Sequence, residues 1–193
     1  MPLSAPQPSR RRVHTREVRY EGFRRDDGAY EVDARLTDVK DADYTLITGL
    51  RRTGEPVHQL SVRIAFDRHY IITAVEASSD WVPYPGACGE IAPAYKKLIG
   101  LSLMHGFRNA LRDRLGGSEG CTHITEMLGG LPTAAVQMRA GEVHEVDIGG
   151  GGKPFQLDRC HALVTTGPTV RRYYAQWYRD GMATAAEPVV TSK

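Results

Sequence analysis

The sequence has few cysteines, and their number is odd. Cys88, Cys121 and Cys160 are the three cysteines among 193 residues, and they lie far apart along the chain. A small secreted protein held together by disulfides normally carries more cysteines, in an even number. We therefore expect reduced thiols in a cytosolic protein, where each thiol is a small buried apolar group, a metal ligand or a nucleophile.

Long apolar runs and a strong net charge are lacking as well. No stretch approaches the roughly 18 consecutive apolar residues that a transmembrane helix requires, and segment 1–17 is basic without the apolar region of a secretory signal. The formal net charge of +2 gives no strong field for attracting nucleic acid or an anionic membrane. These absences predict a cytoplasmic protein that binds neither nucleic acid nor a membrane.

Alternation of apolar and polar residues dominates the first half of the chain. In segment 30–36 the apolar side chains stand at every second position, which indicates a strand with one buried face. The same period occurs in two further segments, 16–23 and 57–66, and segment 70–78 is a run rich in β-branched residues. Short turn-forming segments join these strands in pairs, so we expect two antiparallel hairpins in one sheet with a single buried face.

Helical spacing replaces this alternation in the second half. Apolar residues repeat every three or four positions up to Leu115, and Gly116 stands where a helix would end. A second helix is expected with Thr122 as its N-cap, and Pro132 should interrupt it. Segment 154–164 is expected to be a late strand that rejoins the sheet.

The predicted fold class is therefore α+β. An antiparallel sheet from the N-terminal hairpins packs against two or three helices, and the late strand completes it. We expect one domain over residues 13–180. A flexible basic tail, residues 1–12, precedes it, and a flexible tail, residues 181–193, follows it.

The stretch GCTHITEML, residues 120–128, places three chemically active side chains at the expected helix start. A thiol beside a helix N-terminus has a lowered pKa because the positive end of the helix favours the thiolate. Cys121 and His123 therefore qualify as nucleophile and base, or as two ligands of a metal. Glu126 follows His123 by three positions, on the same side of the helix. The alternative is structural, with a buried thiol and a histidine that bonds a backbone carbonyl.

A zinc-type metal site is a second alternative for the cysteines and histidines. His58 lies on the apolar face of its strand, where a titratable ring needs a partner. Adjacent Cys160 and His161 would point to opposite faces of the expected strand, so at most one of them easily enters a shared pocket. The candidate ligands are His58, Cys88, Cys121, His123 and Cys160. None of them has paired finger-type spacing, so the cofactor is either none or a single divalent metal such as zinc.

A loop rich in proline and glycine follows the second hairpin and supplies further candidates. Loops of this kind carry functional groups over a scaffold. We expect Asp80 and Trp81 to contact substrate, together with Glu126 of the helix. Tyr84 of this loop and Arg63 of the preceding strand are candidates for stabilising a developing negative charge.

Five short motifs together resemble a known family. They are PYPGAC, GF-x6-RLGG, GCTHITEML, LDRCHAL and VRRYY-x2-WY. The combination resembles the bacterial domain-of-unknown-function family numbered 2889, from about His14 to Tyr178. The resemblance implies that Cys121, His123, Cys160 and His161 belong to the signature of that family. It also associates the chain with bacterial catabolism of aromatic compounds, in particular with a phenylcoumaran-type γ-formaldehyde lyase that acts on lignin-derived dimers.

A lyase of this kind requires two catalytic groups. A base takes the proton of a hydroxymethyl group, and an acid or a cation stabilises the leaving phenoxide. A histidine with a pKa near its ordinary value of about 6.5 suits the first role. The candidate catalytic residues are His58, His123, Cys121, Tyr84, Arg63 and His161.

The expected function is accordingly a bacterial lyase that cleaves a carbon–carbon bond of a small aromatic molecule and releases formaldehyde. Two other classes stay open. One is a metalloprotein whose Cys/His site is structural or hydrolytic, and the other is a non-catalytic binding or assembly module. A homodimer is the default expectation for the assembly.

Overall fold

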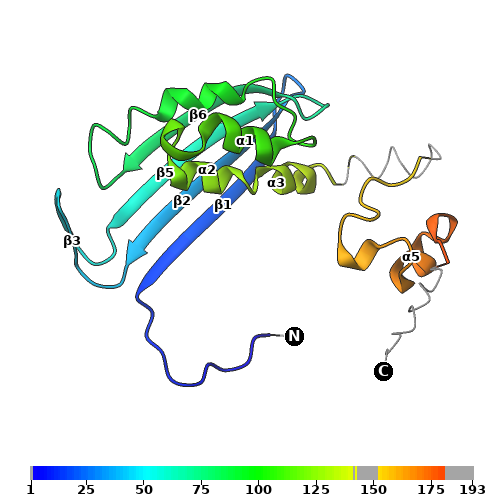
Figure 1. Cartoon of the computed structure of the whole chain (residues 1–193), viewed down its shortest axis with the longest axis horizontal. Helices are drawn as coiled ribbons and strands as arrows, with labels where there is room; N and C mark the ends of the chain where they lie inside the picture. The colour runs from blue at the N-terminus through cyan, green and yellow to red at the C-terminus, as the bar shows by residue number, and fades with distance from the viewer. Residues whose placement is uncertain (1, 141, 143–151, 181–193) are drawn as a thin grey trace, which may run out of the picture. The chain divides into compact units, whose positions relative to one another are not determined.

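The structure is a computed structural model that describes residues 2–140, 142 and 152–180. The chain divides into two compact units, Met1–Arg139 and Ala140–Lys193, and each is described by itself (Figure 1). None of the helices in these described ranges is long and apolar enough to cross a membrane. The expectation of one domain over 13–180 stays a prediction.

Four long strands form the sheet of the first unit and confirm the two predicted hairpins. They are β1 (His14–Arg24), β2 (Tyr30–Lys40), β5 (Pro56–Phe66) and β6 (Ile72–Trp81). All neighbours are antiparallel, in the order β1-β2-β5-β6. A separate ribbon of β3 (Tyr44–Leu46) and β4 (Gly49–Arg51) was not predicted, because three residues are too few to show a period.

Helices cover one face of this sheet (Figure 1). They are η1 (Ala92–Leu98), α1 (Phe107–Leu115), η2 (Gly117–Glu119), α2 (Thr122–Leu128) and α3 (Leu131–Met138). The predicted end of α1 at Gly116 is confirmed, and Pro132 stands in the first turn of the new helix α3. The α+β fold class is therefore confirmed.

The predicted N-cap of α2 is wrong by one residue. Cys121 is the N-cap, with extended backbone angles, and its carbonyl accepts the hydrogen bond of the Thr125 N–H at 2.9 Å. Thr122 is therefore already the first helical residue. No side chain of the N-cap residue bonds the backbone N–H groups of the first turn of this helix.

The hydrophobic core lies between the sheet and the helices. Even-numbered residues of β2 and β5, such as Leu36 and Ile64, are almost fully buried against Ile124 and Leu128 of α2. Odd-numbered residues of the same strands, such as Asp33, face the other side because side chains alternate along a strand. The sheet thus has one apolar, helix-covered face and one polar face.

The second unit contains η3 (His161–Leu163), α5 (Pro168–Tyr173) and η4 (Ala175–Trp177). The late strand predicted over 154–164 is wrong, because this segment consists of turns and η3. Asp158 has a φ of 62°, outside the extended region. Its carboxylate accepts the backbone N–H of Thr165 at 2.8 Å and Lys153 Nζ at 2.6 Å. The side chain of Asp158 thus forms local hydrogen bonds within the loop, and such bonds compete with the pairing of a strand.

Candidate functional site

Three neighbouring strands each place a polar side chain on the apolar face, at the same end of the sheet. Arg16 of β1 is the register partner of Asp38 in β2, and Asp38 is the partner of His58 in β5. This is the end of the sheet where β2 finishes and β5 begins, next to β3 (Figure 1). Asp38 is only 3% exposed, so its charge has to be met by these neighbours.

The Asp38 carboxylate accepts hydrogen bonds from four nitrogen atoms. Arg16 binds it in a bidentate manner, with Nε 2.8 Å from Oδ1 and Nη2 2.9 Å from Oδ2. His14 Nε2 lies 3.0 Å from Oδ1, and His58 Nδ1 lies 3.1 Å from Oδ2. Both carboxylate oxygens are thereby saturated.

Asp38 is ionised at neutral pH. Its burial by itself raises the pKa, but the hydrogen bonds and charge of Arg16, with smaller contributions from His14 and His58, outweigh burial and lower the pKa below its ordinary value. The carboxylate therefore acts as a fixed negative acceptor for the ring of His58.

His58 is held as a neutral imidazole. Burial lowers its pKa, and the neighbouring His123 lowers it further, whereas Asp38 opposes the shift only in part. Because the ionised carboxylate requires a donor, the proton of the neutral ring is assigned to Nδ1 and the lone pair to Nε2. A neutral imidazole with a free Nε2 is suited to accept a proton or to bind a metal.

Helix α2 brings the GCTH segment against this pair. The rings of His58 and His123 have centroids 4.0 Å apart, with 35° between their planes. Cys121 Sγ lies 3.9 Å from His123 Nδ1, and Glu126 accepts a hydrogen bond from Arg16 Nη1 at 2.9 Å. The structure thus gathers four of the sequence-predicted residues around one point.

The same cluster has the geometry of a metal site. One ligand atom each from Asp38, His58 and His123 lies within 4.8 Å of the others. Since Asp38 already accepts four hydrogen bonds, the two histidines fit as direct ligands and Asp38 fits as the outer carboxylate that orients one of them. Imidazole ligands suit zinc and similar transition metals.

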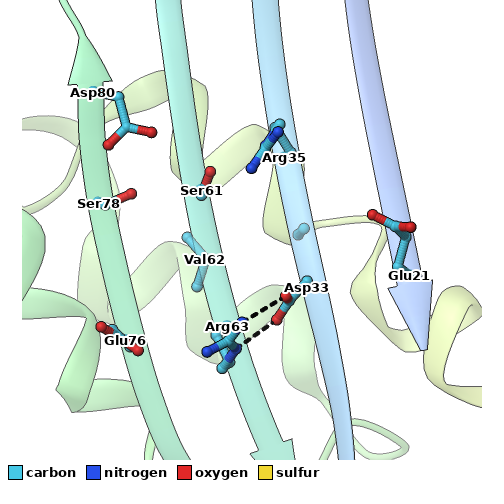
Figure 2. A pocket seen from close by; sticks show the side chains of 10 residues that line it. Glu21, Asp33, Arg35, Ser61, Val62, Arg63, Glu76, Ser78 and Asp80 are labelled. Carbon is cyan, nitrogen blue, oxygen red and sulfur yellow. Dashed lines mark hydrogen bonds and ion pairs between the residues drawn. The ribbon is translucent and has the colours of Figure 1, made fainter. Parts of the chain in front are cut away.

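Arg63 and Asp80 lie elsewhere, on the polar face of the sheet. They line a hollow of about 280 Å³, which Figure 2 shows with their neighbours. Arg63 Nε is 2.7 Å from Asp33 Oδ1 in this hollow. Strand alternation puts these side chains on the opposite face from His58, so this hollow is not lined by the histidines of the cluster.

The loop candidates of the first unit are not members of the cluster, and the second-unit candidates are described by themselves. The Trp81 ring lies 5.2 Å from the Arg51 guanidinium, Tyr84 is 54% exposed, and Cys88 is half-buried. In the second unit, Cys160 is exposed and precedes His161 at the start of η3.

Sequence reasoning missed His14, Arg16 and Asp38. The sequence did contain a signal for Asp38. The buried apolar residues of β2 stand at every second position, and Asp38 occupies the next position of that series after Leu36. Once the hairpin register is known, the same rule finds Arg16 on the neighbouring strand. An acid and a base on the apolar faces of adjacent strands indicate a buried pair.

Comparison with known protein families gives a match over most of the first unit. The profile of the family DUF2889, described as a protein of unknown function, matches residues 14–137. This range lies within the first unit and contains the whole cluster, whereas the LDRCHAL stretch lies outside it. No curated protein and no solved structure matches the chain.

Proposed function

The chain belongs to the DUF2889 family, and from the geometry of its histidine cluster we propose that it is a small-molecule enzyme with His58 as general base. One observation carries this proposal: the buried, ionised Asp38 accepts the Nδ1–H of His58. The hydrogen bond holds the ring in one tautomer and leaves Nε2 ready to take a proton near neutral pH.

The proposed reaction is the loss of formaldehyde from an aromatic, lignin-derived dimer that carries a hydroxymethyl group beside an aryl ether. His58 Nε2 takes the hydroxyl proton, the C–C bond to the hydroxymethyl carbon breaks, and formaldehyde leaves. The released electron pair forms a carbon–carbon double bond and expels the phenoxide, to which His123 gives a proton. The 4.0 Å between the two rings supports this division of roles within one substrate.

The test is formaldehyde release from a phenylcoumaran-type dimer. His58→Gln should lower kcat by about 100-fold or more, as expected for the loss of a general base. His105→Gln is the matched control, because His105 is an exposed histidine outside the cluster. Equal activity of the His58→Gln variant and the control would overturn the proposal, and so would a wild-type protein that releases no formaldehyde.

A metal centre is the second candidate, and the convergence of Asp38, His58 and His123 within 4.8 Å favours it. The two histidines would bind the metal, with Cys121 next to His123 as a further candidate ligand. A bound divalent metal would supply a Lewis acid. Metal analysis of tag-free protein decides between the candidates: about one metal per chain, lost in His58→Ala and His123→Ala, supports the centre. A metal-free protein that is active excludes it.

The proposal further includes a cytoplasmic location, a small aromatic ligand and a homodimeric assembly. The three free cysteines support a reducing compartment. Sedimentation equilibrium tests the dimer. A protein that releases no formaldehyde and binds no metal would be a non-catalytic binding module instead.

A further inference from the structure

A buried tyrosine contacts the backbone that carries the GCTH segment. Tyr95 of η1 is fully buried. Its hydroxyl oxygen accepts the N–H of Cys121 at 2.9 Å. The same hydroxyl lies 3.1 Å from the carbonyl oxygen of Cys121 and 3.1 Å from Thr125 Oγ1. Tyr95 therefore supplies the hydrogen-bond acceptor for the backbone N–H of Cys121, the N-cap residue of α2.

The direction of each hydrogen bond in this group follows from the available protons. Thr125 Oγ1 donates its proton to the carbonyl of Leu115 at 3.1 Å. The hydroxyl of Tyr95 consequently donates toward Thr125 or the Cys121 carbonyl while it accepts from Cys121. Burial raises the pKa of Tyr95, against the hydrogen bonds to Thr125 and Cys121, so the hydroxyl keeps its proton at neutral pH.

Close packing leaves the segment little freedom to move. A Cβ on Gly120 would collide with the backbone carbonyl of Leu115 at the end of α1. The chain between α1 and α2 is thus pressed against α1 on one side and bonded to Tyr95 at the next residue. His123 follows two residues later in the first turn of α2, so a displacement at Cys121 would move its ring.

We propose that Tyr95 is a positioning residue, whose hydroxyl fixes the start of α2 so that His123 stands against His58. The expected effect of Tyr95 on the reaction rate rests on the proposed function. The expected effect of Tyr95 on the placement of the His58 and His123 rings does not. The Tyr95 hydroxyl bonds the backbone of Cys121 and the hydroxyl of Thr125, and it acts on the reaction through His123.

The test compares Tyr95→Phe with Tyr20→Phe. Tyr20 is the matched control, because its hydroxyl donates to the Met127 carbonyl at the other end of α2. Each variant removes one hydroxyl that holds the same helix. The readout is the NMR shift of the His58 ring protons, which the nearby His123 ring displaces; His58→Gln and His123→Gln assign the signals.

Tyr95→Phe should move the His58 ring signals toward their values in the His123→Gln variant, and Tyr20→Phe should leave them in place. On the proposed substrate, Tyr95→Phe should lower kcat by about 10- to 100-fold with little change in KM, because small misplacements of a catalytic group have effects of this size. Unmoved His58 signals in Tyr95→Phe, or equal movement in both variants, would overturn the proposal. Moved signals in a protein without lyase activity would support the positioning role and overturn only the proposed function.

A measurement on the wild type covers the case in which Tyr95→Phe does not fold. The amide proton of Cys121 should exchange with solvent as slowly as those inside α2, because the buried hydroxyl holds it. Exchange of the Cys121 amide at the rate of an exposed turn would overturn the proposal without any variant.

Discussion

Asp38 and His58 face each other across β2 and β5, and His58 Nδ1 lies 3.1 Å from Asp38 Oδ2. Either group alone, buried on the apolar face of the sheet without a partner, would destabilise the protein. Together, and with the bidentate Arg16, they form a closed set of hydrogen bonds. The pair is therefore a structural element of this end of the sheet, and it is also the pair to which the proposed function assigns the general base.

Asp38→Asn should destabilise the protein. The amide cannot accept four hydrogen bonds, and it leaves Arg16 without its buried counter-charge. Removal of one partner of a buried pair costs 3–5 kcal/mol, and because Arg16 is one-third exposed we expect about 2 kcal/mol in the free energy of unfolding. Urea denaturation with a two-state fit measures it.

Asp33→Asn is the control for this prediction. It removes the same type of carboxylate from the same strand, but its partner Arg63 is half exposed on the polar face. Pairs of this kind contribute about 1 kcal/mol or less. Equal destabilisation by the two variants would contradict the view that Asp38 is special to the site.

The stability of the protein should fall as the pH is lowered from about 6.5, the ordinary pKa of histidine. The folded pKa of His58 is lowered, so in this window the unfolded chain binds a proton that the folded protein does not. The free energy of unfolding therefore rises with pH until both forms of His58 are neutral. Asp38, whose pKa is also lowered, adds a second loss of stability below about pH 4.

The pH effect has a specific control. The charged and titratable groups that act on His58 are Asp38 and Arg16 on the strands and His123 on α2, with Cys121 beside His123. His58→Gln should remove the loss of stability between neutral pH and the folded pKa of His58. A variant that keeps the wild-type slope in this window would show that another group titrates there.

Most of the sheet followed from the sequence, and the reason is physical. A period of two is set by which side chains are buried, so segments such as 30–36 identify strand and buried face together. The strand predicted over 154–164 was wrong. The segment has a short apolar alternation, but Asp158 adopts a left-handed backbone conformation and its carboxylate accepts the N–H of Thr165. Local side-chain bonds of that kind leave little trace in a hydrophobic pattern.

Half of the candidate site was within reach of the sequence. Motif content identified His123 and Cys121, and the apolar surroundings identified His58. Their convergence depends on the packing of α2 on β2 and β5, which one-dimensional patterns do not encode. Tyr95 lies in the short 3-10 helix η1, and the bond of its hydroxyl to Cys121 is a contact that depends on the tertiary packing, so the sequence gives no reason to single it out.

Gly120→Ala should destabilise the protein by about 1–3 kcal/mol, the range for an added methyl group that has no space. The backbone of Gly120 is extended, at φ −150°, so alanine adopts it without torsional strain. The cost comes from the Leu115 carbonyl, which a Cβ would meet and which also accepts the Thr125 hydroxyl. Gly89→Ala is the control, because a Cβ added at Gly89 would lie 3.9 Å from the nearest atom. This variant should change the free energy of unfolding by less than about 0.5 kcal/mol. Urea denaturation compares them, and a Gly120→Ala protein as stable as Gly89→Ala would mean that α1 and α2 are not pressed together at this glycine.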